Sequence, residues 1–235
     1  METIPVIDVR HGLAVAAVRG QRADYRPLVT PLAEGSAPAD IACGYAALFT
    51  FPVLYVADLD GIEGRGRDAG LPARLAAAVT GLHLWVDDGT RARAAAQRIA
   101  DEQHATLVIG TESLSDGQDV AAMRALPHDR YVLSLDFDND RFVGPREVLD
   151  EPQHWPLSVI VMTLARVGSA EGPDVQRIAS IVGRAGGRRI YAAGGVRNRA
   201  DIGALHAAGA AGVLIATALH AGTIKADDLE EIADL

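Results

Sequence analysis

Two aspartates stand at the ends of apolar runs, where a carboxyl group could transfer protons. Asp8 follows "IPVI" and Asp136 follows "YVLSL", and each run has the length of a buried strand. Two carboxyl groups that face one cavity can serve as general acid and general base when their surroundings separate their pKa values. Each aspartate could instead cap the turn after its strand. Because the two hold equivalent places in a repeat described below, we expect the catalytic role.

A glycine pair marks a second chemical site. The stretch "YAAGGVRNRA" at 191–200 runs from an apolar segment through two glycines into a helical pattern. Glycines let backbone amides approach an anion, and the following helix contributes its dipole. We therefore expect phosphate here, although a simple tight turn would also use two glycines. The residues expected to bind substrate or phosphate are Gly194, Gly195, Val196, Arg197, Ala216, Thr217, Thr163 and Gly168.

The stretch "LWVDDGTRARA" at 84–94 has the same shape but carries Asp87 and Asp88 where an anion would sit. Two carboxylates about 4–6 Å from a phosphate would cost several kcal/mol at an effective dielectric of about 20. We expect this loop to have lost phosphate binding. A cationic, hydroxylated or metal-linked group would suit the two aspartates better.

Three further residues are accessory candidates. Asp58 follows an apolar run and could orient the site or cap a turn. Arg22 lies in a long segment after the first run, where it could clamp an anion as part of a lid or form a surface salt bridge. His11 follows the first run and could reach the site, although a loop histidine is the simpler interpretation. The histidines do not cluster at metal-ligand spacing, so neither a metal nor a cofactor is expected.

The elements that must position these residues alternate along the chain. Short apolar runs, each too short for a helix, are separated by Ala- and Arg-rich helical patterns, as in a parallel sheet buried on both faces. Eight such runs favour a (β/α)8 barrel over an open doubly wound sheet. We expect one domain over residues 1–235, with a long excursion at about 10–31 that can form a hairpin. The runs lie at 4–9, 53–59, 82–86, 105–110, 131–137, 158–164, 189–194 and 212–217.

The two halves of the chain resemble each other. The stretch at 84–94 aligns with 190–200, and "VIGTESL" at 108–114 aligns with "LIATALH" at 214–220, both at an offset of 106 residues. Asp8 and Asp136 are equivalent once the excursion is allowed for. This internal repeat predicts a barrel of two similar half-barrels, with the two aspartates on opposite sides.

Composition excludes several classes of function. The chain has 235 residues, 49% of them hydrophobic, and a formal net charge of −9. No basic run indicates a nucleic acid, and no apolar run has membrane-spanning length. A single cysteine and the lack of a signal-peptide pattern at the N-terminus predict a cytoplasmic protein. The expected partner is a small phosphorylated substrate, with no nucleic acid and no membrane.

The motifs together carry a family resemblance over the whole chain. "PVIDVRHGLAV", "VADLDG", "LSLDF" and "AAGGVRNRADI" resemble the histidine-biosynthesis barrels, and "VIDV" resembles the phosphoribosylformimino-aminoimidazole carboxamide ribotide isomerase more than the related cyclase. The resemblance implies an Amadori rearrangement of an aminoaldose to an aminoketose, with Asp8 and Asp136 as the acid and base. It also implies a long substrate with a phosphate at each end.

The sequence departs from this family in the first half. The family's glycine-rich first loop reads "VDDGTR" here, and its acidic positions after the sixth strand are occupied by Leu164 and Val167. "GQRADYRP" and "VIGTE" resemble a divergent branch of archaea and methylotrophic bacteria, found beside genes for one-carbon carriers such as tetrahydromethanopterin and methanofuran. We expect an isomerase acting on a phosphorylated sugar-amine or cofactor precursor. The alternatives are the histidine-pathway isomerase itself and a barrel that binds a phosphorylated ligand without catalysis.

Overall fold

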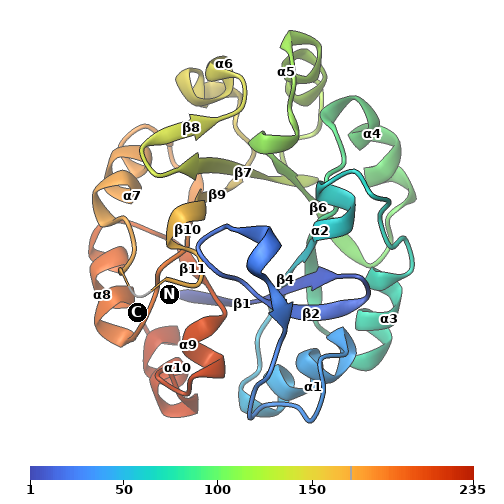
Figure 1. The fold of residues 1–235 in the computed structure, drawn as a ribbon. Helices are drawn as coiled ribbons and strands as arrows, with labels where there is room; N and C mark the ends of the chain where they lie inside the picture. Colours follow the sequence, from blue (N-terminus) through green and yellow to red (C-terminus); the bar gives the residue numbers. More distant parts are fainter. Residues whose placement is uncertain (170) are drawn as a thin grey trace.

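Eight parallel strands close into a barrel in the computed structural model, which describes residues 1–169 and 171–235 (Figure 1). Each strand pairs with its neighbours, and β11 pairs with β1 to close the sheet. The expected (β/α)8 barrel is therefore confirmed. The barrel strands are β1 (Glu2–Arg10), β4 (Val53–Asp58), β5 (His83–Asp87), β6 (Ala105–Gly110), β7 (Tyr131–Asp138), β9 (Ser158–Thr163), β10 (Arg189–Ala193) and β11 (Gly212–Ile215).

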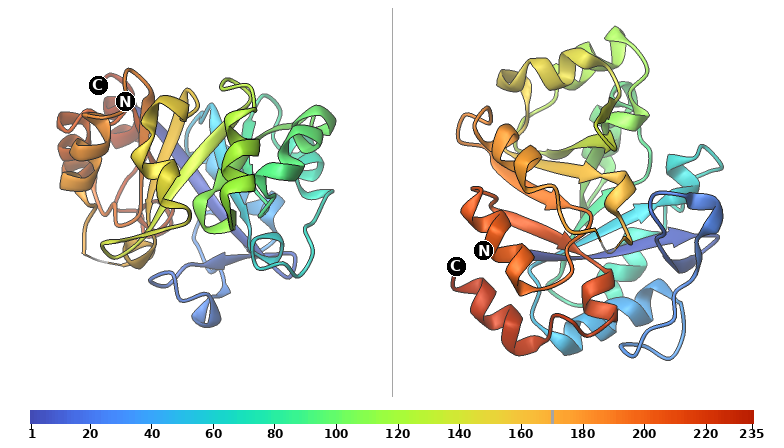
Figure 2. Two further views of the ribbon diagram at one scale, coloured as in Figure 1. Left: turned by 90° about the horizontal axis from the view of Figure 1, so that it is seen from above. Right: turned by 60° about the vertical axis from the view of Figure 1, so that its left-hand side comes forward.

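Helices surround the strands on the outside (Figures 1 and 2). Side-chain caps begin several of them, such as Asp116 before α5, Asp174 before α7 and Asn198 before α8. Each cap accepts a backbone N–H that the first helical turn would otherwise leave unpaired. The helices are α1 (Pro38–Leu48), α2 (Leu59–Ile62), α3 (Leu71–Ala78), α4 (Ala92–Asp101), α5 (Gly117–Arg124), α6 (Arg146–Asp150), α7 (Val175–Val182), α8 (Arg199–Ala207), α9 (Thr217–His220) and α10 (Ala226–Ala233). Among the described residues, no helix has the length and apolar character needed to cross a membrane.

Alternation along the strands separates two apolar cores. Odd and even positions of a strand point to opposite faces, so one set fills the barrel and the other packs beneath the helices. The inner set includes Trp85 and Tyr191, which meet edge to face with ring centroids 4.9 Å apart. These two residues are equivalent in the sequence repeat, so the half-barrels meet through related side chains. The same alternation decides which polar residues face the mouth.

The excursion after the first strand folds back over one end of the barrel (Figure 2). β2 (Leu13–Ala16) pairs antiparallel with β1, and β3 (Arg26–Pro27) pairs with β2, with the short helix η1 (Arg22–Asp24) between them. The segment expected at about 10–31 thus contains the expected hairpin. A second hairpin, not expected from the sequence, joins β7 to β8 (Arg141–Val143).

Candidate active site in the barrel mouth

A cavity of about 520 Å³ opens at the carboxyl ends of the strands, beneath the excursion. Asp8 and Asp136 both line it, as the half-barrel repeat predicts. They reach it because each lies on the inward-facing set of its strand. Active sites of such barrels are built at this end, from the loops that follow the strands. The cavity is therefore the candidate active site.

Asp136 is held from three directions. Its Oδ1 accepts from the Ser134 hydroxyl at 2.7 Å, and its Oδ2 accepts from the Glu112 backbone N–H at 3.0 Å and the Thr111 hydroxyl at 3.2 Å. Burial raises the pKa of Asp136 to about 7, and the nearby Glu112 charge adds to the rise, while the three hydrogen bonds oppose it. This carboxyl group has a fixed orientation and titrates near neutral pH.

Asp8 has a different environment. No described residue donates a hydrogen bond to its carboxyl group, which stays partly exposed to the cavity. Burial among apolar walls raises its pKa to about 6, and the positive charge of Arg22 limits the rise. Two carboxyl groups from opposite half-barrels thus face one cavity, and each can take up or release a proton near neutral pH.

A third carboxyl group, that of Asp87, faces the same cavity. Asp87 is only 4% exposed, and its Oδ1 accepts from the Gly89 N–H at 3.1 Å. Burial raises the pKa of Asp87 well above its usual range, and the charges of Asp136 and Glu112 raise it further. Its Oδ2 and the Oδ2 of Asp136 lie 3.1 and 3.2 Å from the point where a side chain on Gly110 would begin. Gly110 therefore leaves the two carboxylates free to converge.

The glycine loop after β10 lies on the other side of the cavity. Gly194 and Gly195 have φ of 101° and 84°, in the region that favours glycine. A Cβ on Gly194 would stand 2.6 Å from the Thr163 carbonyl oxygen, and one on Gly195 would overlap the Gly172 carbonyl. Gly194, Gly195 and Val196 line the cavity, together with Ala216, Thr217 and Gly168 from the neighbouring loops.

The excursion contacts the loops of both half-barrels. On the first half, Arg22 pairs with Glu112 at 2.6 Å, and Arg10 donates to the Arg22 carbonyl. On the second half, the Arg19 N–H donates to the Val167 carbonyl at 2.7 Å. Gly168, with φ of 66°, lies so close to the backbone of Ala17 that any side chain would overlap it. Arg22 thus belongs to a lid, where it is paired with a protein carboxylate.

Two residues expected to bind substrate lie elsewhere. Thr163 is on the outward-facing set of β9, where its hydroxyl accepts from Arg177 at 3.2 Å. Met162, which pairs with Asp136 across the sheet, is the residue that faces the cavity. Arg197 does not line the cavity, because its guanidinium and its backbone N–H both donate to Asp201. These two placements correct the sequence-based expectation.

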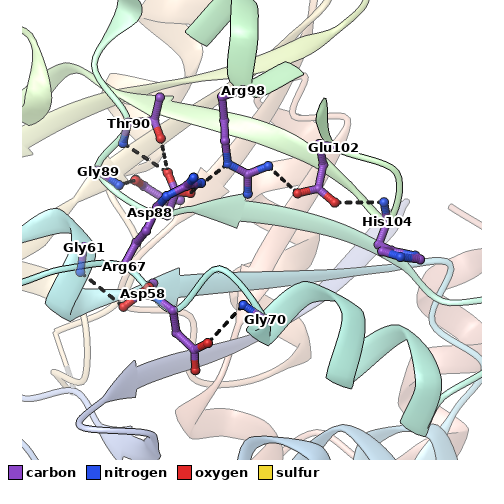
Figure 3. A network of polar contacts seen from close by, with 12 residues as sticks. Asp58, Gly61, Arg67, Gly70, Asp88, Gly89, Thr90, Arg98, Glu102 and His104 are labelled. Carbon is purple, nitrogen blue, oxygen red and sulfur yellow. Dashed lines mark hydrogen bonds and ion pairs between the residues drawn. The ribbon is translucent and has the colours of Figure 1, made fainter. Parts of the chain in front are cut away.

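Two accessory candidates, His11 and Asp58, also lie outside the cavity. His11 is 71% exposed at the tip of the β1–β2 turn, where its backbone N–H donates to Asp60 at 2.6 Å. Asp58 is on the outward face of β4, where its carboxylate accepts from the backbone N–H of Gly61 (Figure 3). The same carboxylate also accepts from the backbone N–H of Asp68. In the structure both make local contacts outside the cavity, and the Asp58 carboxylate caps the turn after its strand.

Asp88 points away from the cavity, into a polar network behind the loop (Figure 3). Its carboxylate accepts from Thr90 and pairs with Arg67 at 3.3 Å and Arg98 at 3.1 Å. Asp87 lines the cavity and Asp88 lies in this network, so the two carboxylates do not act together. The sequence-based argument counted both carboxylates against an anion in this loop, whereas only Asp87 faces the cavity.

The buried ion pair predicts a structural defect when Asp88 is lost. Asp88→Ala is expected to lower the free energy of unfolding by about 3 kcal/mol, because the buried positive charge of Arg98 then loses part of the negative charge that balances it. Asp87→Asn, one residue away, removes an unpaired buried charge and is the matched control; it is expected not to lower stability. Urea unfolding followed by circular dichroism measures both. Equal losses for the two variants would contradict this assignment.

Two cavity residues were not identified as site residues from the sequence. Glu112 lies in the short 3-10 helix Thr111–Ser113 that follows β6, and it lines the cavity two residues after the strand ends. His220 lines the cavity and lies between the Tyr45 hydroxyl at 2.8 Å and the Thr30 hydroxyl at 3.0 Å. Burial lowers its pKa to about 4, so it is neutral. Among the described residues, no group of three or more His, Cys, Asp or Glu side chains is arranged to hold a metal ion.

Comparisons with known proteins agree with this geometry. An uncharacterized protein of Methanocaldococcus jannaschii is 28% identical over 239 residues, covering 99% of this chain and 97% of the relative. Two further relatives are each named as a phosphoribosyl imidazole-4-carboxamide isomerase, and each is 28% identical to this chain. The match to the Thermococcus kodakarensis protein covers 99% of this chain and 97% of the relative. The match to the Myxococcus xanthus protein covers 96% of each. These names agree with the isomerase-like enzyme that the sequence motifs predict.

The model of one protein family, described as histidine biosynthesis protein, matches residues 2–225. This match includes all eight strands of the barrel, the lid and both loops of the mouth. The resemblance stated from the sequence motifs is thereby confirmed. The chain belongs to the histidine biosynthesis protein family.

Proposed function

We propose that the protein is an aldose–ketose isomerase that rearranges a phosphorylated sugar-amine. The observation that supports this most directly is the pair Asp8 and Asp136, which enter one covered cavity from opposite half-barrels. Both have pKa values raised toward neutrality by burial. A proton donor and a proton acceptor can therefore coexist in the cavity at neutral pH, which is the condition for general acid–base catalysis.

The rearrangement uses two proton transfers. The protonated carboxyl group donates its proton to the ring oxygen as the sugar ring opens and the C1–nitrogen bond becomes an iminium. The ionised carboxylate removes the proton from C2, and the electron pair of that C–H bond neutralises the iminium to give an enaminol. Return of a proton to C1 and loss of the hydroxyl proton at C2 give the aminoketose. No external oxidant or reductant is required.

The glycine loop provides a place for one phosphate. Backbone N–H groups near Gly194 and Gly195 can approach an anion because neither residue carries a side chain, and Thr217 adds a hydroxyl group from the next loop. We place the substrate phosphate here, at the edge of the cavity opposite Asp87. The reacting carbons would then lie between the phosphate and the two catalytic carboxyl groups.

This placement predicts that inorganic phosphate stabilises the protein. At ten times its Kd, phosphate should raise the melting temperature by about 3–5 °C. Thr217→Val and Gly195→Ala are expected to remove most of this shift. Gly203→Ala, in α8 with open space where its Cβ would stand, is the matched glycine control and should retain it. An unchanged shift in both loop variants, measured by differential scanning fluorimetry, would count against the site.

The substrate class we propose to examine first is a phosphorylated precursor of a one-carbon carrier, such as tetrahydromethanopterin or methanofuran. This choice rests on the motifs shared with the divergent branch that occurs beside genes for such carriers. The second candidate is the histidine-pathway isomerase, which the names of the two isomerase relatives favour. Turnover of candidate sugar-amine phosphates, followed by the appearance of the aminoketose, decides between them. A barrel that binds phosphorylated ligands but turns over none of them would support the non-catalytic alternative.

A further inference from the structure

The two sides of the cavity have opposite chemical character, although they come from equivalent half-barrels. Asp87 aligns with Ala193 in the sequence repeat, and Glu112 aligns with Ala218. The side near β10 and β11 therefore presents glycine and alanine, whereas the side near β5 and β6 presents carboxylates. A substrate that fills such a cavity must itself have two different ends.

The acidic side contains a group that no described protein atom neutralises. Asp87 is 4% exposed, and only its Oδ1 has a hydrogen-bond donor, from Gly89. Its Oδ2 faces the cavity without a partner in the described part of the chain. A buried carboxylate without a counter-charge is costly, so such a group either retains a proton or accepts a cation.

The geometry shows where that cation would sit. The Oδ2 atoms of Asp87 and Asp136 converge on the space in front of Gly110, where the lack of a side chain leaves room. The Asp136 Oδ2 already accepts from Glu112 and Thr111, so the unpartnered acceptor at this point is the Oδ2 of Asp87. Among the described lining residues, Arg22 is the only arginine or lysine, and it is already paired with Glu112 at 2.6 Å. Two carboxylate oxygens thus converge at this point. The positive charge of Arg22 is taken up by Glu112 and does not compensate them.

We propose that Asp87 binds a positively charged nitrogen group of the substrate, an amine or amidinium, at the end opposite the phosphate. This inference builds on the proposed function and narrows its substrate to a compound with one phosphate and one cationic nitrogen. Asp87 accepts a hydrogen bond from the nitrogen, which holds C1 and C2 of the sugar-amine beside Asp136. The cation displaces the proton that burial retains in this cluster.

Glucosamine 6-phosphate and glucose 6-phosphate are matched probes, because they differ by an ammonium group in place of a hydroxyl group. We expect the wild-type protein to bind glucosamine 6-phosphate about tenfold or more tightly, as a charge-assisted hydrogen bond provides. Asp87→Asn should abolish this preference while leaving the affinity for glucose 6-phosphate nearly unchanged. Asp88→Asn, which changes a carboxylate outside the cavity, should retain the preference. Isothermal titration calorimetry in two buffers of different ionisation enthalpy also measures proton release, expected for glucosamine 6-phosphate alone.

Several outcomes would overturn the proposal. These are equal affinity for the two sugar phosphates, binding of neither, and a preference that survives in Asp87→Asn. Stabilisation by Mg²⁺ that Asp87→Asn removes, without an ammonium preference, would assign the acidic side to a metal ion instead. The proposed isomerase activity is tested separately, because Asp8→Asn should lower turnover by a factor of about 10²–10⁴ and yet retain the ammonium preference. An inactive wild-type protein that retains the preference would contradict the isomerase proposal alone.

Discussion

Asp8→Asn and Asp136→Asn are each expected to lower kcat by a factor of about 10²–10⁴, the usual contribution of a general acid or base. The amide has nearly the shape of the carboxyl group but cannot accept or donate the transferred proton. Steady-state kinetics on the sugar-amine substrate measures the loss. Thr163→Val, which changes a hydroxyl group on the outer face of the same barrel, is the control and should alter kcat less than threefold.

The pH dependence follows from the two pKa values. The base must be ionised and the acid protonated, so kcat/KM should fall below about pH 6, where Asp8 becomes protonated, and above about pH 7, where Asp136 ionises. Each variant should lose the limb of this narrow bell that its carboxyl group controls. A profile that stays flat between pH 5 and pH 9 would remove these residues from the proton transfers.

The same shifts predict a gain in stability from the inactive variants. A carboxyl group whose pKa is raised by folding opposes folding once the pH exceeds the unfolded value of 3.8, and the full cost is present above about pH 7. At pH 8, Asp8→Asn and Asp136→Asn should therefore melt at higher temperature than the wild type. This gain shows that lost activity comes from chemistry and not from unfolding.

The second large effect concerns the histidine intermediate, a ribotide that the family resemblance describes as carrying a phosphate at each end. We expect the protein not to restore growth to a bacterium that lacks the histidine-pathway isomerase. The second phosphate would meet Asp87, and loss of one charge-assisted phosphate contact weakens binding by about 2–4 kcal/mol before any repulsion is counted. In an assay with purified ribotide, the kcat/KM of this protein should be at least 30-fold lower than that of the bacterium's own histidine-pathway isomerase.

Asp87→Gly tests the cause of that failure. It restores the residue type that the family uses in this loop and should raise ribotide turnover, whereas Asp88→Gly should mainly lower stability. Full rescue of growth by the wild-type protein would contradict the prediction. Another group, such as Arg91 or the backbone of the loop, would then have to hold the second phosphate.

The strands and the two catalytic candidates could be predicted because both follow from local pattern. Each apolar run of strand length became a barrel strand, and the half-barrel repeat placed Asp8 and Asp136 at one mouth. The alternation of inward-facing and outward-facing positions along a strand also decides which residues line the cavity. Counting along β9 from Ile160, which faces inward, makes Met162 the cavity residue and Thr163 the outward one. The same count separates Asp87 from Asp88.

Other features depend on contacts that no local pattern contains. Arg22 was a candidate clamp for an anion, but its partner in the structure is Glu112, 90 positions away in the sequence. The excursion packs against Gly168 because the backbone of Ala17, about 150 residues earlier in the sequence, lies close to that glycine. Arg197 was an expected phosphate ligand, and only the structure shows that its guanidinium donates to Asp201 instead.

The docking of the excursion on both half-barrels has a consequence for the timing of turnover. With Arg22 on Glu112 and Arg19 on Val167, the excursion is fixed on two opposite sides of the mouth, and moving it aside requires both contacts to break. Opening is then a collective motion of the whole segment through solvent, on the microsecond to millisecond scale typical of such loops. Where this motion is slower than the proton transfers, kcat will respond to solvent viscosity and will show no isotope effect from deuterium at C2. Opening of the lid, and not proton transfer by the carboxylates, would then limit kcat.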